Sequence, residues 1–131
     1  MTDHASPRRR GRESNEVVVI LWRDIPAQVN GQRGRERRQI LLSEKFQRAI
    51  DRAKRKAGIY TAHDDISQWQ RVTTAVNGDA FDAAQTRADE LEADYSSVYL
   101  GRLAFAGGFI AQMNDESVAR ADLAALEELD D

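Results

Sequence analysis

The stretch Val17-Val18-Val19-Ile20-Leu21-Trp22 places six large apolar residues in a row near the start of a 131-residue chain. Four of the six are β-branched, and the run is too short for a buried helix. We therefore expect a strand that is covered on both faces. Pro26 lacks a backbone donor and restricts Ile25 to extended geometry, so this strand should end near residue 25.

Two further segments complete the expected sheet. Residues 27–30 are interpreted as a short second strand, and residues 35–42 return as a third strand with a charged front. Gly31 and Gly34 lie between them and tolerate positive φ. The sequence thus predicts a small antiparallel three-stranded meander.

Residues 44–57 carry the signals of an amphipathic helix that packs on this sheet. Ser43 is a suitable N-cap, and Gly58 follows a basic last turn as a C-terminal stop. The apolar positions recur at spacings of three and four: Phe46, Ala49, Ile50, Ala53 and Ala57. One helix over a meander is a two-layer α+β unit.

A second helix is expected over about 64–75. Thr61 followed by Asp64 resembles a capping box with Asp in place of Glu. The apolar residues after it repeat at helical spacing: Ile66, Trp69, Val72 and Val76. Asn77-Gly78 then breaks the pattern and is the expected hinge.

Residues 79–131 are interpreted as an acidic, mainly helical extension. A long helix is expected before Gly101, two helical pieces are expected around Gly107-Gly108, and a short helix is expected over about 118–129. The long helix carries an apolar stripe that we expect to meet a partner or a second copy; it includes Phe81, Leu91, Tyr95 and Val98. The expected organisation is a flexible basic arm over 1–15, an α+β domain over 16–76, and this extension.

The charges of the two halves have opposite sign, although the formal net charge of the chain is only −3. Residues 1–72 hold 16 Lys and Arg against 9 Asp and Glu, whereas residues 73–131 hold 3 against 13. This asymmetry favours either an acidic or polyanionic partner for the front half or attraction between the halves, within one chain or between chains.

Little in the composition favours catalysis. The absence of cysteine excludes disulfides, thiolate metal sites and cysteine nucleophiles. Of the two histidines, His4 lies in the arm and His63 lies in His63-Asp64-Asp65, where a helix cap accounts for the acids. We expect no catalytic residue, no metal site and no cofactor. A basic start without an apolar run favours the cytoplasm, and no stretch reaches the roughly 18 to 20 apolar residues of a membrane span.

The most distinctive stretch is Trp22-Arg23-Asp24-Ile25-Pro26. A Trp at the end of a buried strand, an Arg/Asp pair and a turn fixed by Pro make a rigid corner. Two interpretations are open: a structural corner that closes the core, or a binding site in which Trp22, Arg23 and Asp24 meet a ligand. Further candidate binding residues are arginines that are expected at the surface: Arg35, Arg37, Arg48 and Arg52.

Three segments resemble a known family. The run from Leu21 to Val29, the run over residues 42–53, and Ala57-Gly58 with Trp69 look like the small virulence-factor domain. That domain occurs at the end of the staphylococcal conserved virulence factor C and in short stand-alone bacterial proteins. The resemblance covers about residues 17–72 and leaves 79–131 outside. It implies a compact bacterial cytoplasmic domain, and it implies no reaction, ligand or catalytic residue.

Three hypotheses of function follow from the sequence. The first is a non-enzymatic interaction, adaptor or regulatory module that acts through protein–protein contacts or self-association. The second is a nucleic-acid-binding accessory protein that uses the basic front half. The third is a small enzyme or enzyme subunit, for which Arg23, Asp24 and His63 would have to line one pocket.

Overall fold

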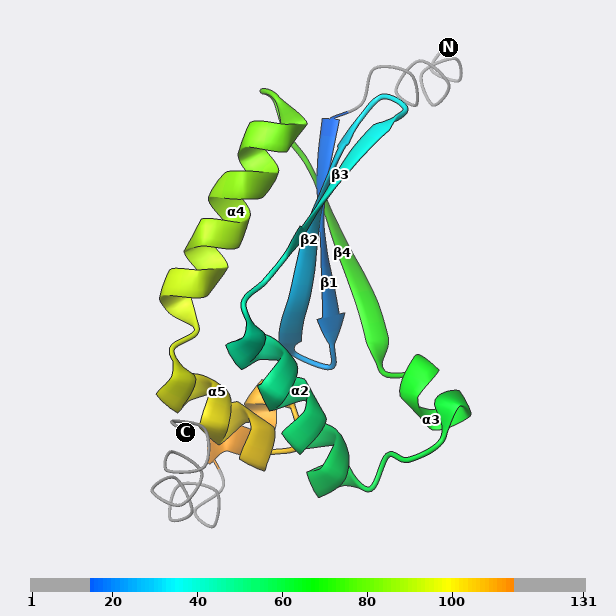
Figure 1. The fold of residues 1–131 in the computed structure, drawn as a ribbon, viewed down its shortest axis with the longest axis vertical. Helices are drawn as coiled ribbons and strands as arrows, with labels where there is room; N and C mark the ends of the chain where they lie inside the picture. Colours follow the sequence, from blue (N-terminus) through cyan, green and yellow to red (C-terminus); the bar gives the residue numbers. More distant parts are fainter. Residues whose placement is uncertain (1–14, 115–131) are drawn as a thin grey trace.

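A four-stranded antiparallel sheet forms one layer of the protein. The computed structural model describes residues 15–114, and its strands follow the order β3-β2-β1-β4 across the sheet (Figure 1). The strands are β1 (Asn15–Trp22), β2 (Ile25–Arg33), β3 (Glu36–Leu41) and β4 (Trp69–Ala75). The α+β class is confirmed, and the sheet has one strand more than the three that the sequence predicts.

The apolar run forms the strand β1 in the interior of the sheet. Val19 lies opposite Val29 of β2 on one side and opposite Val72 of β4 on the other. The register between β1 and β2 shifts after Ile20, next to Pro26. Because β1 pairs with a strand on each side, its backbone N–H and C=O groups are hydrogen-bonded within the sheet.

The expected helix over 64–75 is wrong. A short helix, α3 (Ala62–Ile66), ends early, and the chain continues as β4. Only the start follows the prediction, since the Thr61 side chain caps α3 by accepting a 3.1 Å hydrogen bond from the backbone N–H of Asp64. The β-branched run Val72-Thr73-Thr74 suits a strand, and pairing with β1 outweighs the helical spacing of the apolar residues.

Helix α4 (Ala80–Asp94) packs on the sheet, and helices α2 (Glu44–Ala57) and α5 (Ser97–Phe105) pack on each other, with α2 also in contact with β2. The bounds of α2 are those predicted, and Gly58 ends the helix in the left-handed conformation at φ 74°. Helix α4 lies on β2 and β1, whereas α2 packs against α5 at the other end of the sheet (Figure 1). No helix of the described residues is long and apolar enough to cross a membrane.

One hydrophobic cluster joins the sheet to helices that precede Asn77-Gly78 in the sequence and to helices that follow it. Its largest fully buried members come from β1, β2, α2 and α5: Trp22, Ile25, Phe46, Ile50, Leu100 and Leu103. Gly31 of β2 permits the closest approach of α4, because a Cβ there would lie 2.8 Å from the carbonyl oxygen of Ala80. Gly31 lies within β2 and does not have positive φ, whereas Gly34 has φ 60° in the β2–β3 turn.

The single long helix expected before Gly101 is divided into α4 and α5. The break occurs at Tyr95-Ser96, where the Ser96 side chain accepts a 3.1 Å hydrogen bond from the N–H of Tyr99 and so caps α5. Gly107 and Gly108 both have positive φ and separate α5 from the 3-10 helix η2 (Ile110–Asn114), as predicted. The arm before residue 15 and the helix expected over 118–129 lie outside the described residues.

Candidate functional site

The corner between β1 and β2 is held by Arg23. Its Nε donates a 2.8 Å hydrogen bond to Oε1 of Gln68, and its Nη1 donates a 2.8 Å bond to the carbonyl oxygen of Gly107. The guanidinium also lies over two rings, 5.0 Å from the centroid of Trp22 and 4.4 Å from that of Phe109. Burial lowers the pKa of Arg23. The side chain thus clamps the end of the sheet to the segments after α3 and α5.

Asp24 completes this clamp. Its backbone N–H donates to the carbonyl oxygen of Gly108 at 2.9 Å, and its Oδ2 accepts a 2.8 Å bond from the N–H of Ile110. Gly108 is required by close approach as well as by its φ of 92°, because a Cβ there would lie 3.1 Å from the Trp22 ring and 3.3 Å from Cβ of Arg23. These contacts agree with a structural corner, while its role as a binding site is a prediction that no observation tests.

Asp65 of α3 gathers three donors beside this corner. Its Oδ1 accepts a 2.8 Å bond from Nε1 of Trp22 and lies 2.9 Å from Nζ of Lys54, and its Oδ2 accepts a 3.2 Å bond from Nε1 of Trp69. Burial alone would raise the pKa of Asp65. The hydrogen bonds from Lys54, Trp69 and Trp22, with the charge of Lys54, outweigh it and hold the pKa below its usual value.

His63, which the enzyme hypothesis needs beside Arg23 and Asp24, lies exposed on α3. The pocket next to Arg23 has a volume of about 290 Å³ and is lined by Lys56, Phe105, Phe109 and their neighbours, without His63 or Asp24. Within residues 15–114, no three His, Asp or Glu side chains are grouped so as to hold a metal ion.

The four candidate arginines lie on the β2–β3 hairpin and on α2, whose turn and helix are at different ends of the sheet (Figure 1). Arg35 is exposed at the β2–β3 turn, and Arg37 lies on β3. Arg48 and Arg52 lie on α2, where Nη1 of Arg48 is 3.5 Å from the Glu44 carboxylate. Two of the candidate arginines therefore belong to the β2–β3 hairpin, and the other two belong to α2.

The predicted interaction stripe packs mostly within the chain. Leu91 is buried in the core, and Tyr95 contacts the rings of Phe46 and Tyr99. The half-buried ring of Phe81 lies under the guanidinium groups of two hairpin arginines, Arg33 and Arg38, at 4.3 and 4.7 Å. Val98 is the one residue of the four that is exposed, so the stripe as a whole does not present a continuous apolar surface.

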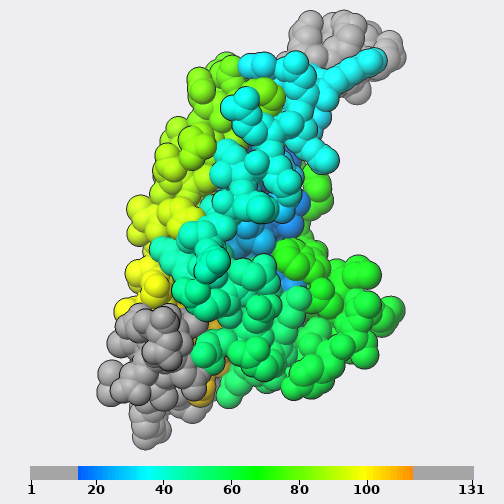
Figure 2. Space-filling model, in the orientation of Figure 1, coloured from blue at the N-terminus to red at the C-terminus, as the bar shows by residue number. Residues whose placement is uncertain are grey.

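An exposed surface of a different kind occurs at β4. All seven residues of this edge strand are exposed, and Val72 retains half of its accessible surface. Its inner edge pairs with β1, and within residues 15–114 no backbone hydrogen bond is made at its outer edge. The space-filling view is hollowed beside this strand, between the β2–β3 hairpin and α3 (Figure 2).

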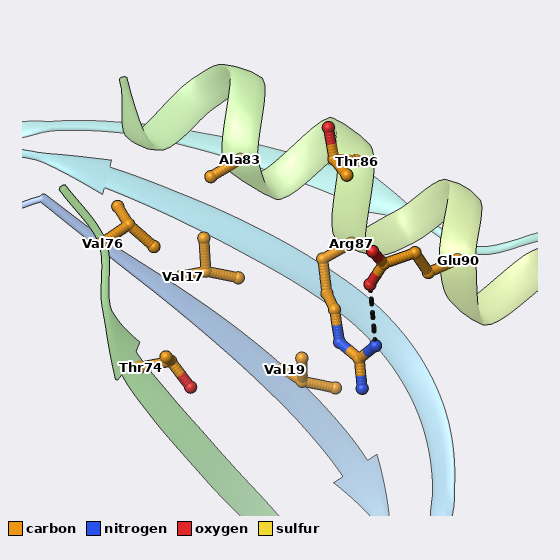
Figure 3. Close-up of a pocket in the computed structure, with 8 residues that line it drawn as sticks. All are labelled: Val17, Val19, Thr74, Val76, Ala83, Thr86, Arg87 and Glu90. Atoms are coloured by element: carbon orange, nitrogen blue, oxygen red, sulfur yellow. Dashed lines mark hydrogen bonds and ion pairs between the residues drawn. The ribbon is translucent and has the colours of Figure 1, made fainter. Parts of the chain in front are cut away.

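A groove of about 430 Å³ adjoins β4 on the helix side of the sheet. Val17 and Val19 of β1 form its floor with Thr74 and Val76, and they point toward α4 (Figure 3). The α4 wall carries Ala83, Thr86 and an ion pair of 3.0 Å between Arg87 and Glu90. Helix α4 lies over β2 and β1. The face of β4 on this side of the sheet is therefore not covered by the described helices.

The comparison with known families extends the resemblance seen in the sequence. A model of the family described as virulence factor matches residues 20–104. The chain belongs to the virulence factor family. The match passes residue 72, where the resemblance was expected to end, and takes in α4 and most of α5. No curated protein and no solved structure matches the chain.

The edge strand β4 is not predicted from the sequence, because the apolar spacing of these residues favours a helix. The signal was present in the sequence: Val72-Thr73-Thr74 is β-branched throughout, and Gln70, Val72 and Thr74 alternate with Arg71 and Thr73. The spacing of Trp69, Val72 and Val76 matched a helix equally well, so short apolar spacing alone could not decide between the two.

Proposed function

We propose that this member of the virulence factor family is a non-enzymatic interaction module that associates through the outer edge of β4, with a second copy of the same chain as its partner. The observation that carries the proposal is the edge strand Trp69–Ala75, in which every residue is exposed and whose outer backbone groups have no partner within residues 15–114. An edge of this kind is a template for pairing with another strand.

The two edges of the sheet differ in how they are protected. Edge strand β3 carries Glu36, Arg37 and Arg38 in six residues, and such charges discourage pairing with another chain. Edge strand β4 carries Arg71 alone, no proline and three β-branched residues in seven. Pairing at β4 is therefore the less costly of the two.

The β4 sequence is self-complementary in antiparallel pairing. A two-fold axis at Val72 places Val72 opposite its copy and Arg71 opposite Thr73 of the other chain. No like charges meet, since the single arginine faces a hydroxyl group. The remaining pairs join Gln70 to Thr74 and Trp69 to Ala75.

Such pairing would join two sheets into one and bring both helix layers to the same side. A two-fold axis perpendicular to the sheet keeps equivalent faces together. The two apolar grooves beside α4 would then face each other across the β4 seam, with Val17 and Val19 of each chain on the floor. Burial of this apolar surface adds to the energy of the backbone hydrogen bonds.

Charge substitutions at Thr73 test the pairing and its register in the full chain. Thr73 is exposed, so substitution leaves the core intact. In the proposed register, Thr73→Lys sets two lysines against two arginines, and Thr73→Glu creates two opposite-charge pairs. Sedimentation velocity should show a concentration-dependent dimer whose dissociation constant rises about three- to tenfold with Lys and falls by a similar factor with Glu.

Thr73→Gln is the neutral control and should leave the dissociation constant near the wild-type value. The gain from Thr73→Glu should shrink as salt is added, because exposed charges are screened. A wild-type chain that stays monomeric at its solubility limit would overturn the proposal. Equal effects of Lys and Glu would overturn the register.

A further inference from the structure

The sheet face opposite α4 carries a polar cleft of about 350 Å³. Its lining comes from all four strands: Ile20 of β1, Gln28 and Asn30 of β2, Arg37 and Gln39 of β3, and Arg71 of β4. The two arginines therefore approach one cleft from the two outer strands, with amide side chains and Ile20 between them. A volume of this size accommodates a small organic molecule.

The amide side chains form a directed relay across the cleft. Nε2 of Gln39 donates a 2.9 Å hydrogen bond to Oε1 of Gln28, and Nε2 of Gln28 donates a 3.3 Å bond to Oδ1 of Asn30. The relay occupies the side-chain oxygens of Gln28 and Asn30. It leaves Nδ2 of Asn30 as a terminal donor, which makes no hydrogen bond with any described residue.

Asn30 is unusual because it is only 4% exposed and is the sole buried polar or charged residue within 15–114. Its amide nitrogen is not one of the fully buried side-chain atoms that lack a partner, so it stays open to the cleft, where a ligand or water supplies an acceptor. The residue lines the cleft, so an acceptor reaches it from the cleft side. This is a second reason, besides the arginines, to expect a ligand that is rich in acceptor oxygens.

The charge of the cleft has one sign. Arg37 and Arg71 contribute two positive charges, and no carboxylate from residues 15–114 lines the cleft. Among the described residues, neither arginine has an ion-pair or hydrogen-bond partner, whereas Arg33 on the same hairpin is paired with Glu36 and Asp79, each at 2.8 Å. Guanidinium groups without internal partners are suited to bidentate contact with carboxylate or phosphate.

We infer that this cleft binds a small organic anion, with Arg37 and Arg71 holding its anionic oxygens from either side and Nδ2 of Asn30 donating from the floor. Ile20 offers a small apolar surface for the carbon skeleton of the ligand. Arg71 also takes part in the proposed pairing of β4, so the tests of this site use Asn30 and Arg37, which belong to β2 and β3.

Nuclear magnetic resonance titration of the full chain tests the inference, with citrate and inorganic phosphate as separate probes at constant ionic strength. The side-chain amide signals of Asn30 and Gln28 should shift in a saturable manner with at least one probe, and the comparison of the probes tells a carboxylate site from a phosphate site. Arg37→Gln should weaken binding about tenfold or more, because a charge-assisted hydrogen bond is lost. Asn30→Asp places a negative charge on the floor and should abolish binding.

Arg35→Gln is the matched control: it removes the same charge from the exposed turn of the same hairpin, outside the cleft. Its affinity should stay within about twofold of the wild type. The inference fails if neither probe gives saturable shifts up to on the order of 10 mM, or if Arg35→Gln weakens binding as much as Arg37→Gln. Sedimentation of Arg37→Gln should match the wild type, so failure of this site and failure of β4 pairing are separate outcomes.

Discussion

Nε1 of Trp22 donates a 2.8 Å hydrogen bond to Oδ1 of Asp65, a residue 43 positions later in the chain. Trp22 is fully buried at the end of β1, and Asp65 lies on α3 immediately before β4. The same carboxylate accepts a bond from Trp69, the first residue of β4, and pairs with Lys54 of α2. One acid therefore fixes the point at which the edge strand begins.

Asp65→Ala should destabilise the protein by about 1–3 kcal/mol, because it leaves the buried indole N–H of Trp22 without an acceptor. Urea unfolding followed by tryptophan fluorescence measures the loss. Asp64→Ala is the matched control, since the neighbouring carboxylate has no partner among the described side chains and should cost little. Equal stability of the two variants would contradict this role of Asp65.

The Asp65 carboxylate should also make stability depend on pH. Its folded-state pKa is lowered, so its contribution is present above the unfolded-state pKa and is lost as the pH falls through the lower, folded value. The difference in unfolding free energy between wild type and Asp65→Asn should thus be constant near neutral pH and shrink below about pH 4. Other acids titrate in both proteins and cancel. A difference that grows in acid would be the wrong sign.

Gly31→Ala should destabilise the protein by about 1–3 kcal/mol, because the new Cβ lies 2.8 Å from the carbonyl oxygen of Ala80 and α4 must move away from β2. Thermal unfolding followed by circular dichroism measures the change. Gly78→Ala serves as control, since its Cβ would meet no atom within 4 Å. Equal melting temperatures for Gly31→Ala and Gly78→Ala would contradict the close packing of α4.

Arg23 has φ 54°, in the left-handed region that favours glycine. Arg23→Ala and Arg23→Gly both lose the bonds to Gln68 and Gly107, but only the alanine variant keeps the backbone strain. The alanine variant should be less stable by about 1 kcal/mol in urea unfolding. The opposite order would show that the corner relaxes to another conformation.

The sequence predicts the local parts of the fold well. Helix α2 is marked by Ser43, by its apolar spacing and by Gly58, and its bounds agree with the structure. Strand β1 follows from six apolar residues in a row. These signals are local and need no partner elsewhere in the chain.

The features that the sequence does not predict depend on contacts between residues that are distant in the chain. Strand β4 exists because it pairs with β1, about 50 positions earlier, and its apolar spacing alone fits a helix. The polar cleft combines side chains of all four strands, so it could not be predicted while the sheet lacked β4. Arg37 was a candidate from its charge alone; Asn30 and Arg71 required the register of the sheet.

The measurement that tests β4 pairing most directly is disulfide cross-linking. The chain contains no cysteine, so an introduced cysteine has no native thiol with which to react. In a two-fold antiparallel pair, a single cysteine variant cross-links only if the residue faces its own copy, and a mixture of two variants cross-links if the two residues face each other. Under mild oxidation Val72→Cys should form a covalent dimer, Gln70→Cys alone should not, and Gln70→Cys mixed with Thr74→Cys should. Absence of the Val72→Cys dimer, or equal cross-linking at Val72 and Gln70, would contradict the account.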